Sequence, residues 1–176
     1  MKNPLTTVQR IHRLGRILST LFFVTSIILL IALLTATGII HNALKGGKTA
    51  EDIFEGGVSF TLETLYGLTA ALSDFALGEI FLSRYAQSYF TLELEKGTPF
   101  NEECVRKLRK LGILTIIITI VECACASILY SSILTKYGNM ASLEPRATGG
   151  VILGVMFIIL SLFSGYGTEL EEKNRK

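Results

Sequence analysis

The stretch ILSTLFFVTSIILLIALLTATGII, residues 17–40, contains no charged side chain. At about 1.5 Å per residue, a helix over these residues reaches across the roughly 30 Å hydrocarbon core of a bilayer. Three further apolar segments follow at residues 57–82, 112–134 and 147–164. Four such segments in a chain of 176 residues predict an all-α fold, an integral membrane four-helix bundle.

Lysine and arginine residues are distributed unevenly along this chain. The N-terminal tail, the connection 83–111 and the C-terminal tail hold thirteen of the 17, whereas the other two connections hold four. Because cytoplasmic connections carry the excess of Lys and Arg, we predict that the N-terminus, the C-terminus and residues 83–111 are cytoplasmic. The protein would then be a multi-pass protein of the cell membrane. Its basic excess would contact anionic lipid headgroups on the cytoplasmic side, and we expect no direct contact with nucleic acid.

Composition favours a single membrane domain over residues 1–176, because no second block is long enough to fold separately in water. The sequence contains no glycine-rich phosphate loop, no H-E-x-x-H and no G-x-S-x-G elbow. Cys123 and Cys125 are two residues apart, so they point to different sides of a helix and are poorly placed to share a metal ion. We therefore expect no enzyme activity, no catalytic residue, no cofactor and no metal site.

The cytoplasmic connection has the pattern of one helix ending and another beginning. Gly97 after Lys96 is a typical helix stop, Pro99 prevents the helix from continuing, and Asn101 can cap the next helix. Beyond this cap, apolar residues that include Leu108 can share one face of the new helix. Four basic residues cover much of the rest, forming a collar of Arg106, Lys107, Arg109 and Lys110. The collar either orients the helix and contacts lipid phosphates or docks a partner protein.

The string YFTLELEKGTPFNEECVRKLRKLGIL, residues 89–114, resembles the signature of a bacterial four-helix membrane family catalogued as domain of unknown function 2975. The residues that carry this motif are Gly97, Pro99, Phe100, Asn101, Leu108 and Gly112. The tail FSGYGTELEE, residues 163–172, looks like the family's closing stretch, although the chain then ends in Asn-Arg-Lys instead of an acidic terminus. The resemblance implies a membrane partner for a small cytoplasmic helix-turn-helix regulator.

Two acidic residues are predicted to lie within the membrane, Asp74 in the second segment and Glu122 in the third. A charged carboxylate at the bilayer centre costs about 2.5–3.5 kcal/mol or more, so each must face inward, be protonated or hold a cation. No Lys, Arg or His lies deep within the segments to neutralise them. If the two acids meet across a helix interface, they can form an ion or proton site. Alternatively, protonated carboxyls hydrogen-bond to neighbouring helices as packing contacts.

Small residues mark two expected helix contacts. The spacing Gly150-x-x-x-Gly154 allows close helix approach, either within the bundle or between copies of the chain. In the second segment, one stripe of small and acidic residues is expected to face the bundle: Glu63, Gly67, Ala70, Asp74 and Gly78.

His12 and His41 lie at opposite ends of the first segment and are interpreted as separate interfacial residues.

Two functions remain open from the sequence. The first is a non-enzymatic sensor or regulatory partner, whose face from Arg84 to Lys110, together with the C-terminal tail, would bind a cytoplasmic protein. The second is a small ion- or proton-coupled transporter or channel that uses Asp74 and Glu122. With only four spans, a pore would require a homo-oligomer.

Overall fold

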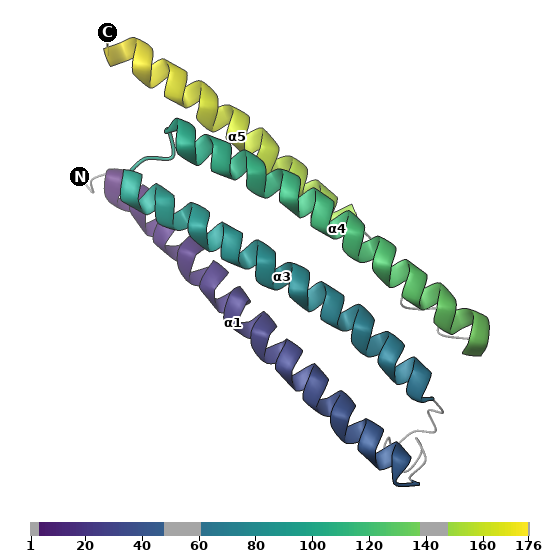
Figure 1. The fold of residues 1–176 in the computed structure, drawn as a ribbon. Helices are drawn as coiled ribbons and strands as arrows, with labels where there is room; N and C mark the ends of the chain where they lie inside the picture. Colours follow the sequence, from purple (N-terminus) through teal and green to yellow (C-terminus); the bar gives the residue numbers. More distant parts are fainter. Residues whose placement is uncertain (1–3, 48–60, 138–147, 176) are drawn as a thin grey trace.

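The computed structural model describes residues 4–47, 61–137 and 148–175 (Figure 1). These residues form four α-helices, each long and apolar enough to span a membrane. The helices are α1 (Pro4–Lys45), α3 (Leu62–Lys96), α4 (Glu102–Tyr137) and α5 (Thr148–Arg175). The predicted all-α class is confirmed. The starts of the second and fourth predicted segments, residues 57–60 and 147, lie outside the described residues.

Each helix continues past at least one end of the apolar segment that predicted it. The α3 helix begins at Leu62, where the Thr61 side chain caps it by accepting the backbone N–H of Thr64 at 3.3 Å, and it continues past the predicted segment to Lys96. The α5 helix likewise continues to Arg175, well past the last apolar residues. Hydropathy detects only the part of a helix that fits a bilayer, whereas backbone hydrogen bonds continue through polar sequence.

The turn between α3 and α4 has the predicted geometry. Gly97 adopts a left-handed φ of 70° and donates its backbone N–H to the Glu93 carbonyl at 2.9 Å, which ends α3. The Asn101 side-chain oxygen accepts the backbone N–H of Glu103 at 2.9 Å and caps α4. The helix stop at Gly97 and the cap at Asn101 are therefore confirmed.

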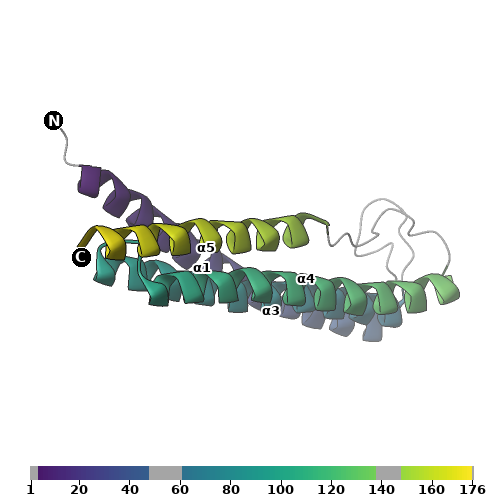
Figure 2. The ribbon, with the colours of Figure 1, turned by 90° about the horizontal axis from the view of Figure 1, so that it is seen from above.

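The helices pack in the order of the chain (Figures 1 and 2). Contacts join α1 to α3, α3 to α4, and α4 to α5. Within the described residues no Cα of α1 lies within 8 Å of α4 or α5. The arrangement is an open layer of four antiparallel helices. The start of α1, the end of α5 and the α3–α4 turn lie at the same end of the molecule, here called the basic end.

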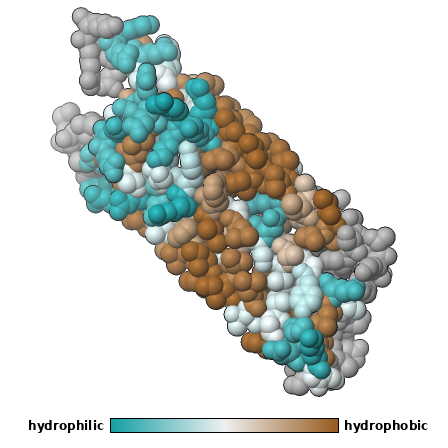
Figure 3. Space-filling view, in the orientation of Figure 1, coloured by the Kyte–Doolittle hydropathy of each residue, from teal (hydrophilic) through white to brown (hydrophobic). Residues whose placement is uncertain are grey.

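Most apolar side chains of this layer point outward. Ile28 is 60% exposed, Leu29 62% and Phe163 70%, and Figure 3 shows an apolar band across the middle of the molecule between two hydrophilic ends. Soluble monomers rarely expose apolar patches of such extent. An exposed band of this kind fits a multi-pass membrane protein, whose outer side chains contact lipid.

The best-buried part of the layer lies near the basic end, between α3 and α4. Its core consists of Tyr89, Leu92, Cys104, Leu108 and Leu111. Val105, Leu108 and Leu111 are all buried, so these apolar residues share one face of α4, as predicted, and that face packs inside the layer.

Small residues bring α4 and α5 together. A Cβ atom added to Gly154 would lie 2.7 Å from the Gly112 carbonyl oxygen, and one added to Gly150 would lie 2.1 Å from the Thr119 hydroxyl oxygen. The glycine pair of α5 therefore packs within the chain, as one of the two predictions for it stated.

The predicted stripe of α3 is only partly inward. Gly78 is buried and Asp74 half-buried, but Glu63 and Ala70 are exposed, so the expectation is wrong for these two. In an open layer α3 has two neighbours, and its buried residues are divided between a face toward α1 and a face toward α4.

Candidate functional site

The intramembrane acids lie at the interface between α3 and α4. A Cβ atom added to Gly78 would lie 1.5 Å from Glu122 Oε1, so the Glu122 carboxyl group sits directly against the α3 backbone. Asp74 lies one turn from Gly78 on α3 and therefore on the same side of that helix, and its Oδ2 atom is buried, as Glu122 Oε1 is. The structure therefore brings Asp74 and Glu122 to the same helix interface.

These acids have unmet hydrogen-bonding capacity. Asp74 Oδ2 and Glu122 Oε1 are buried without a hydrogen-bond partner among the described residues, and so is the hydroxyl oxygen of Ser73. Two neighbouring carboxyl groups resist simultaneous ionisation, so such a pair can take up a proton or a cation. In the described part of the chain, no group of three or more His, Cys, Asp or Glu side chains could hold a metal ion.

The basic collar of α4 divides between two sides of the helix. The Lys107 ammonium group turns toward α3 and donates to the Ser88 carbonyl oxygen at 3.2 Å. Arg106 and Arg109 instead line grooves shared with α5, and Lys110 is exposed. Residues two apart on a helix differ by about 200° in direction, which separates Lys107 from Arg109. The four residues therefore do not form one continuous surface.

Two polar grooves lie between the starting turns of α4 and the final turns of α5. Their volumes are about 500 Å³ and 370 Å³, and four residues line both: Glu102, Arg106, Thr168 and Glu172. Positive and negative side chains alternate here on two adjoining helices. The ends of α4 and α5 therefore carry charges of both signs beside these grooves.

Three of the motif residues at 97–112 have clear packing roles: Phe100, Leu108 and Gly112. Phe100 packs on the tail, because a Cβ atom added to Gly167 would lie 2.5 Å from its ring. Leu108 is buried in the core, and Gly112 permits the close contact with α5. The two stretches that carry the family resemblance, around Phe100 and Gly167, are in contact.

A buried polar cluster near the basic end was missed by the sequence reasoning. Glu93 of α3, 3% exposed, pairs with His12 Nδ1 of α1 and accepts a hydrogen bond from the Tyr89 hydroxyl group. The i, i+4 spacing of Tyr89 and Glu93 was the available signal. Nothing in the sequence indicated that His12 would reach them, because this depends on the register of α1 against α3.

No protein-family model, curated protein or solved structure matches this chain. The resemblance of residues 89–114 to domain of unknown function 2975 stays a prediction.

Proposed function

We propose that the chain is a multi-pass protein of the cell membrane that acts as a non-enzymatic regulatory partner, with its basic end in the cytoplasm docked to a soluble protein. The observation that carries this proposal is the paired extension of α4 and α5. The α4 helix begins at Glu102, ten residues before its apolar segment, and α5 continues to Arg175. At about 1.5 Å per residue, both helices project some 15 Å beyond the bilayer.

The chemistry of this extension supports protein recognition. Glu102, Arg106 and Arg109 of α4 lie beside Glu169 and Glu172 of α5, and all five are exposed. Alternating charges on rigid helix ends select a complementary partner and fix its orientation. The resemblance to the membrane family suggests that the partner is a small helix-turn-helix regulator, which would read nucleic acid in place of this chain.

Photo-crosslinking in cells tests this proposal. A benzophenone side chain at Glu169 is expected to give a discrete adduct with a soluble protein. The same group at Ile159, 46% exposed in the apolar band, is expected to give none. Changing Arg106 and Arg109 to Glu should abolish the adduct through charge repulsion.

The matched control changes Arg13 and Arg16 to Glu. It makes the same change in charge as the Arg106 and Arg109 variant, at the same end of the molecule but on α1. This variant should retain the adduct. An adduct that survives Arg106→Glu with Arg109→Glu, or one that forms equally at Ile159, would contradict docking on the α4–α5 extension.

A second candidate function is favoured by the buried acids. We infer that Asp74 and Glu122 bind a proton or a monovalent cation during ion-coupled transport, because buried carboxylate oxygens without partners need a proton or cation. A pore or pathway would then form between copies of the chain. The alternative is a purely structural role, in which protonated Asp74 and Glu122 only hold α3 against α4.

Measurement of ion flux into liposomes distinguishes a transport role of the two acids from a packing role. If the acids carry ions, the parent protein passes protons or Na⁺, and Asp74→Asn with Glu122→Gln reduces the flux at least about tenfold, the loss expected when a required charge is removed. The control removes two carboxylates outside the apolar band, Glu169→Gln with Glu172→Gln, and should behave as the parent. Equal flux from the Asp74 and Glu122 variant would exclude this mechanism.

A further inference from the structure

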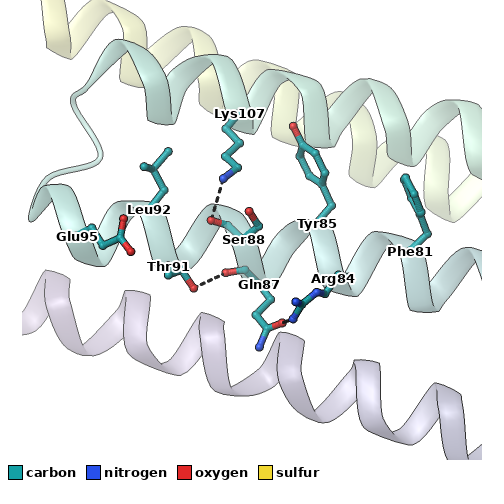
Figure 4. Close-up of a pocket in the computed structure, with 9 residues that line it drawn as sticks. All are labelled: Phe81, Arg84, Tyr85, Gln87, Ser88, Thr91, Leu92, Glu95 and Lys107. Carbon is teal, nitrogen blue, oxygen red and sulfur yellow. Dashed lines mark hydrogen bonds between the residues drawn. The ribbon is translucent and has the colours of Figure 1, made fainter.

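The open packing of the helices leaves one face of α3 uncovered near the basic end. Because α1 and α4 each contact α3 but not each other, part of the α3 surface between them is left open, and a groove lies over it. The groove has a volume of about 650 Å³ and follows α3 from Phe81 to Glu95, with Lys107 of α4 on one side (Figure 4). It is distinct from the grooves between α4 and α5.

Two cations are held in this groove by neutral partners. Arg84 donates to the Gln87 side-chain oxygen at 2.7 Å, and its guanidinium lies 5.7 Å from the ring centre of Phe23 on α1. Lys107 donates to the Ser88 carbonyl oxygen at 3.2 Å. Within the described residues neither cation forms an ion pair with a carboxylate. Their charges are therefore available to an external anion.

The position of Arg84 is fixed from the α1 side. Gln87 accepts from Arg84 and donates its amide N–H to the Thr20 hydroxyl oxygen of α1 at 2.9 Å. Figure 4 shows Gln87 pointing from α3 toward α1 while Lys107 reaches down from α4. A cation positioned in advance loses less conformational entropy when it binds a ligand.

An exposed apolar face of α3 leads up to the cationic part of the groove. Leu77 is 56% exposed and Phe81 55%, and both lie on the face of α3 that continues to Arg84 and Ser88 at i+3 and i+4 spacing. Glu95 lines the opposite end, eleven residues or about 16 Å from Arg84. The cations therefore lie where an apolar surface ends, which is the depth of phospholipid headgroups in a membrane-spanning helix.

We propose that this groove binds one anionic glycerophospholipid, with its phosphodiester between Arg84 and Lys107 and an acyl chain along α3 past Phe81. Neutral hydrogen-bonding groups of Ser88 and Thr91 also line the groove beside the headgroup. A free phosphate would use the cations but not the apolar surface. The site is independent of the partner-docking surface, which lies on the other side of α4.

Native mass spectrometry of the full-length protein in neutral detergent tests the site. Phosphatidylglycerol is expected to give a one-lipid adduct. Phosphatidylcholine with the same acyl chains should bind at least about tenfold more weakly, because its headgroup lacks net negative charge, and inorganic phosphate or glycerol phosphate should give no adduct. Phosphatidylcholine binding as tightly as phosphatidylglycerol, or free phosphate binding as tightly as the lipid, would overturn the proposal.

Paired variants locate the site. Arg84→Gln with Lys107→Gln should weaken phosphatidylglycerol binding at least about tenfold, the effect of losing charge-assisted hydrogen bonds. Arg106→Gln with Arg109→Gln removes the same charge from the α4–α5 side and should bind the lipid as the parent does. Equal lipid binding by both double variants, or loss only in the second, would overturn the assignment.

Two further measurements separate lipid binding from folding. Phosphatidylglycerol should raise the unfolding temperature of the parent but not of Arg84→Gln with Lys107→Gln. Exchanging the cations, Arg84→Lys with Lys107→Arg, should restore the lipid adduct. A thermal shift by the lipid that persists in the charge-removed variant would contradict the site even if that variant is less stable.

Discussion

At the scale of single residues, Glu93 is a buried carboxylate that depends on its hydrogen-bond partners. Its carboxylate is almost fully buried and satisfied by two side chains, His12 from α1 and Tyr89 from the preceding turn of α3. A buried carboxylate that loses a partner retains its desolvation cost without compensation. The cluster therefore ties the position of α1 to that of α3 near the basic end.

Removing the His12 imidazole should show how strongly the fold depends on its pairing with Glu93. His12→Ala is expected to lower the free energy of unfolding in detergent by about 3 kcal/mol, because Glu93 stays buried without its partner. Adding Glu93→Gln should recover part of the loss, since a neutral amide is cheaper to bury and can still accept from Tyr89. Chemical denaturation followed by circular dichroism measures both effects.

The second histidine supplies the control. His41 is joined to Tyr66 by a hydrogen bond of 2.5 Å, but Tyr66 is 48% exposed, so water can replace this contact. His41→Ala should cost well under 1 kcal/mol. Equal destabilisation by His12→Ala and His41→Ala, or no recovery in the double variant, would refute the special role of Glu93.

The residue-scale sites differ in how far sequence could predict them. Asp74 and Glu122 could be identified because a carboxylate in an apolar segment is costly wherever its helix packs. The pairing of His12 with Glu93 could not, because it depends on which helices are neighbours and on their register. One turn of sliding between α1 and α3 would move His12 by about 5.4 Å and break the pair.

At the scale of helices, α4 and α5 are joined by backbone contact. Gly112 and Gly154 face each other so closely that a Cβ atom on either would lie 2.7 Å from the carbonyl oxygen of the other. Lipid provides no hydrophobic drive between helices, so close packing of small residues must supply the association. This contact positions the paired extension toward the basic end.

A methyl group at this contact should separate the helices. Gly154→Ala is expected to destabilise the α4–α5 pair by about 1–3 kcal/mol, because the opposing atom is backbone and cannot rotate away. Gly149→Ala is the matched control, since an added Cβ there meets nothing within 4 Å. Unfolding midpoints in detergent should fall for Gly154→Ala only. A similar fall for both variants would mean that loss of glycine, and not the close contact, is responsible.

The existence of the helices could be predicted well, and their ends only in part. Gly97 and Asn101 carry local signals, so the turn between α3 and α4 followed from sequence. The extension of α5 to Arg175 did not, because its polar residues resemble a tail when read by hydropathy alone. Its contact with Phe100 through Gly167 is long-range and has no local signature.

At the scale of the whole molecule, the layer is open instead of closed. Apolar periodicity reports that a helix has a lipid-compatible surface, but it does not report how many neighbours the helix has. The same four segments are compatible with a closed bundle, here called a ring, or with an open layer in which the helices lie in a row. The row leaves broad faces of α1 and α5 uncovered in the described residues, and it creates the groove over α3.

The orientation of this layer is the prediction on which the proposed docking and lipid sites both depend. Thirteen of 17 basic residues belong to the termini and the connection 83–111, so the basic end should face the cytoplasm. In a chain whose three cysteines are changed to Ala, Lys45→Cys should react with a membrane-impermeant maleimide on intact cells. Glu172→Cys, at the opposite end of the layer, should react only after the membrane is permeabilised. Labelling of both positions on intact cells would contradict a spanning layer, and the reverse pattern would place the α4–α5 extension outside the cell, where it could not dock a cytoplasmic regulator.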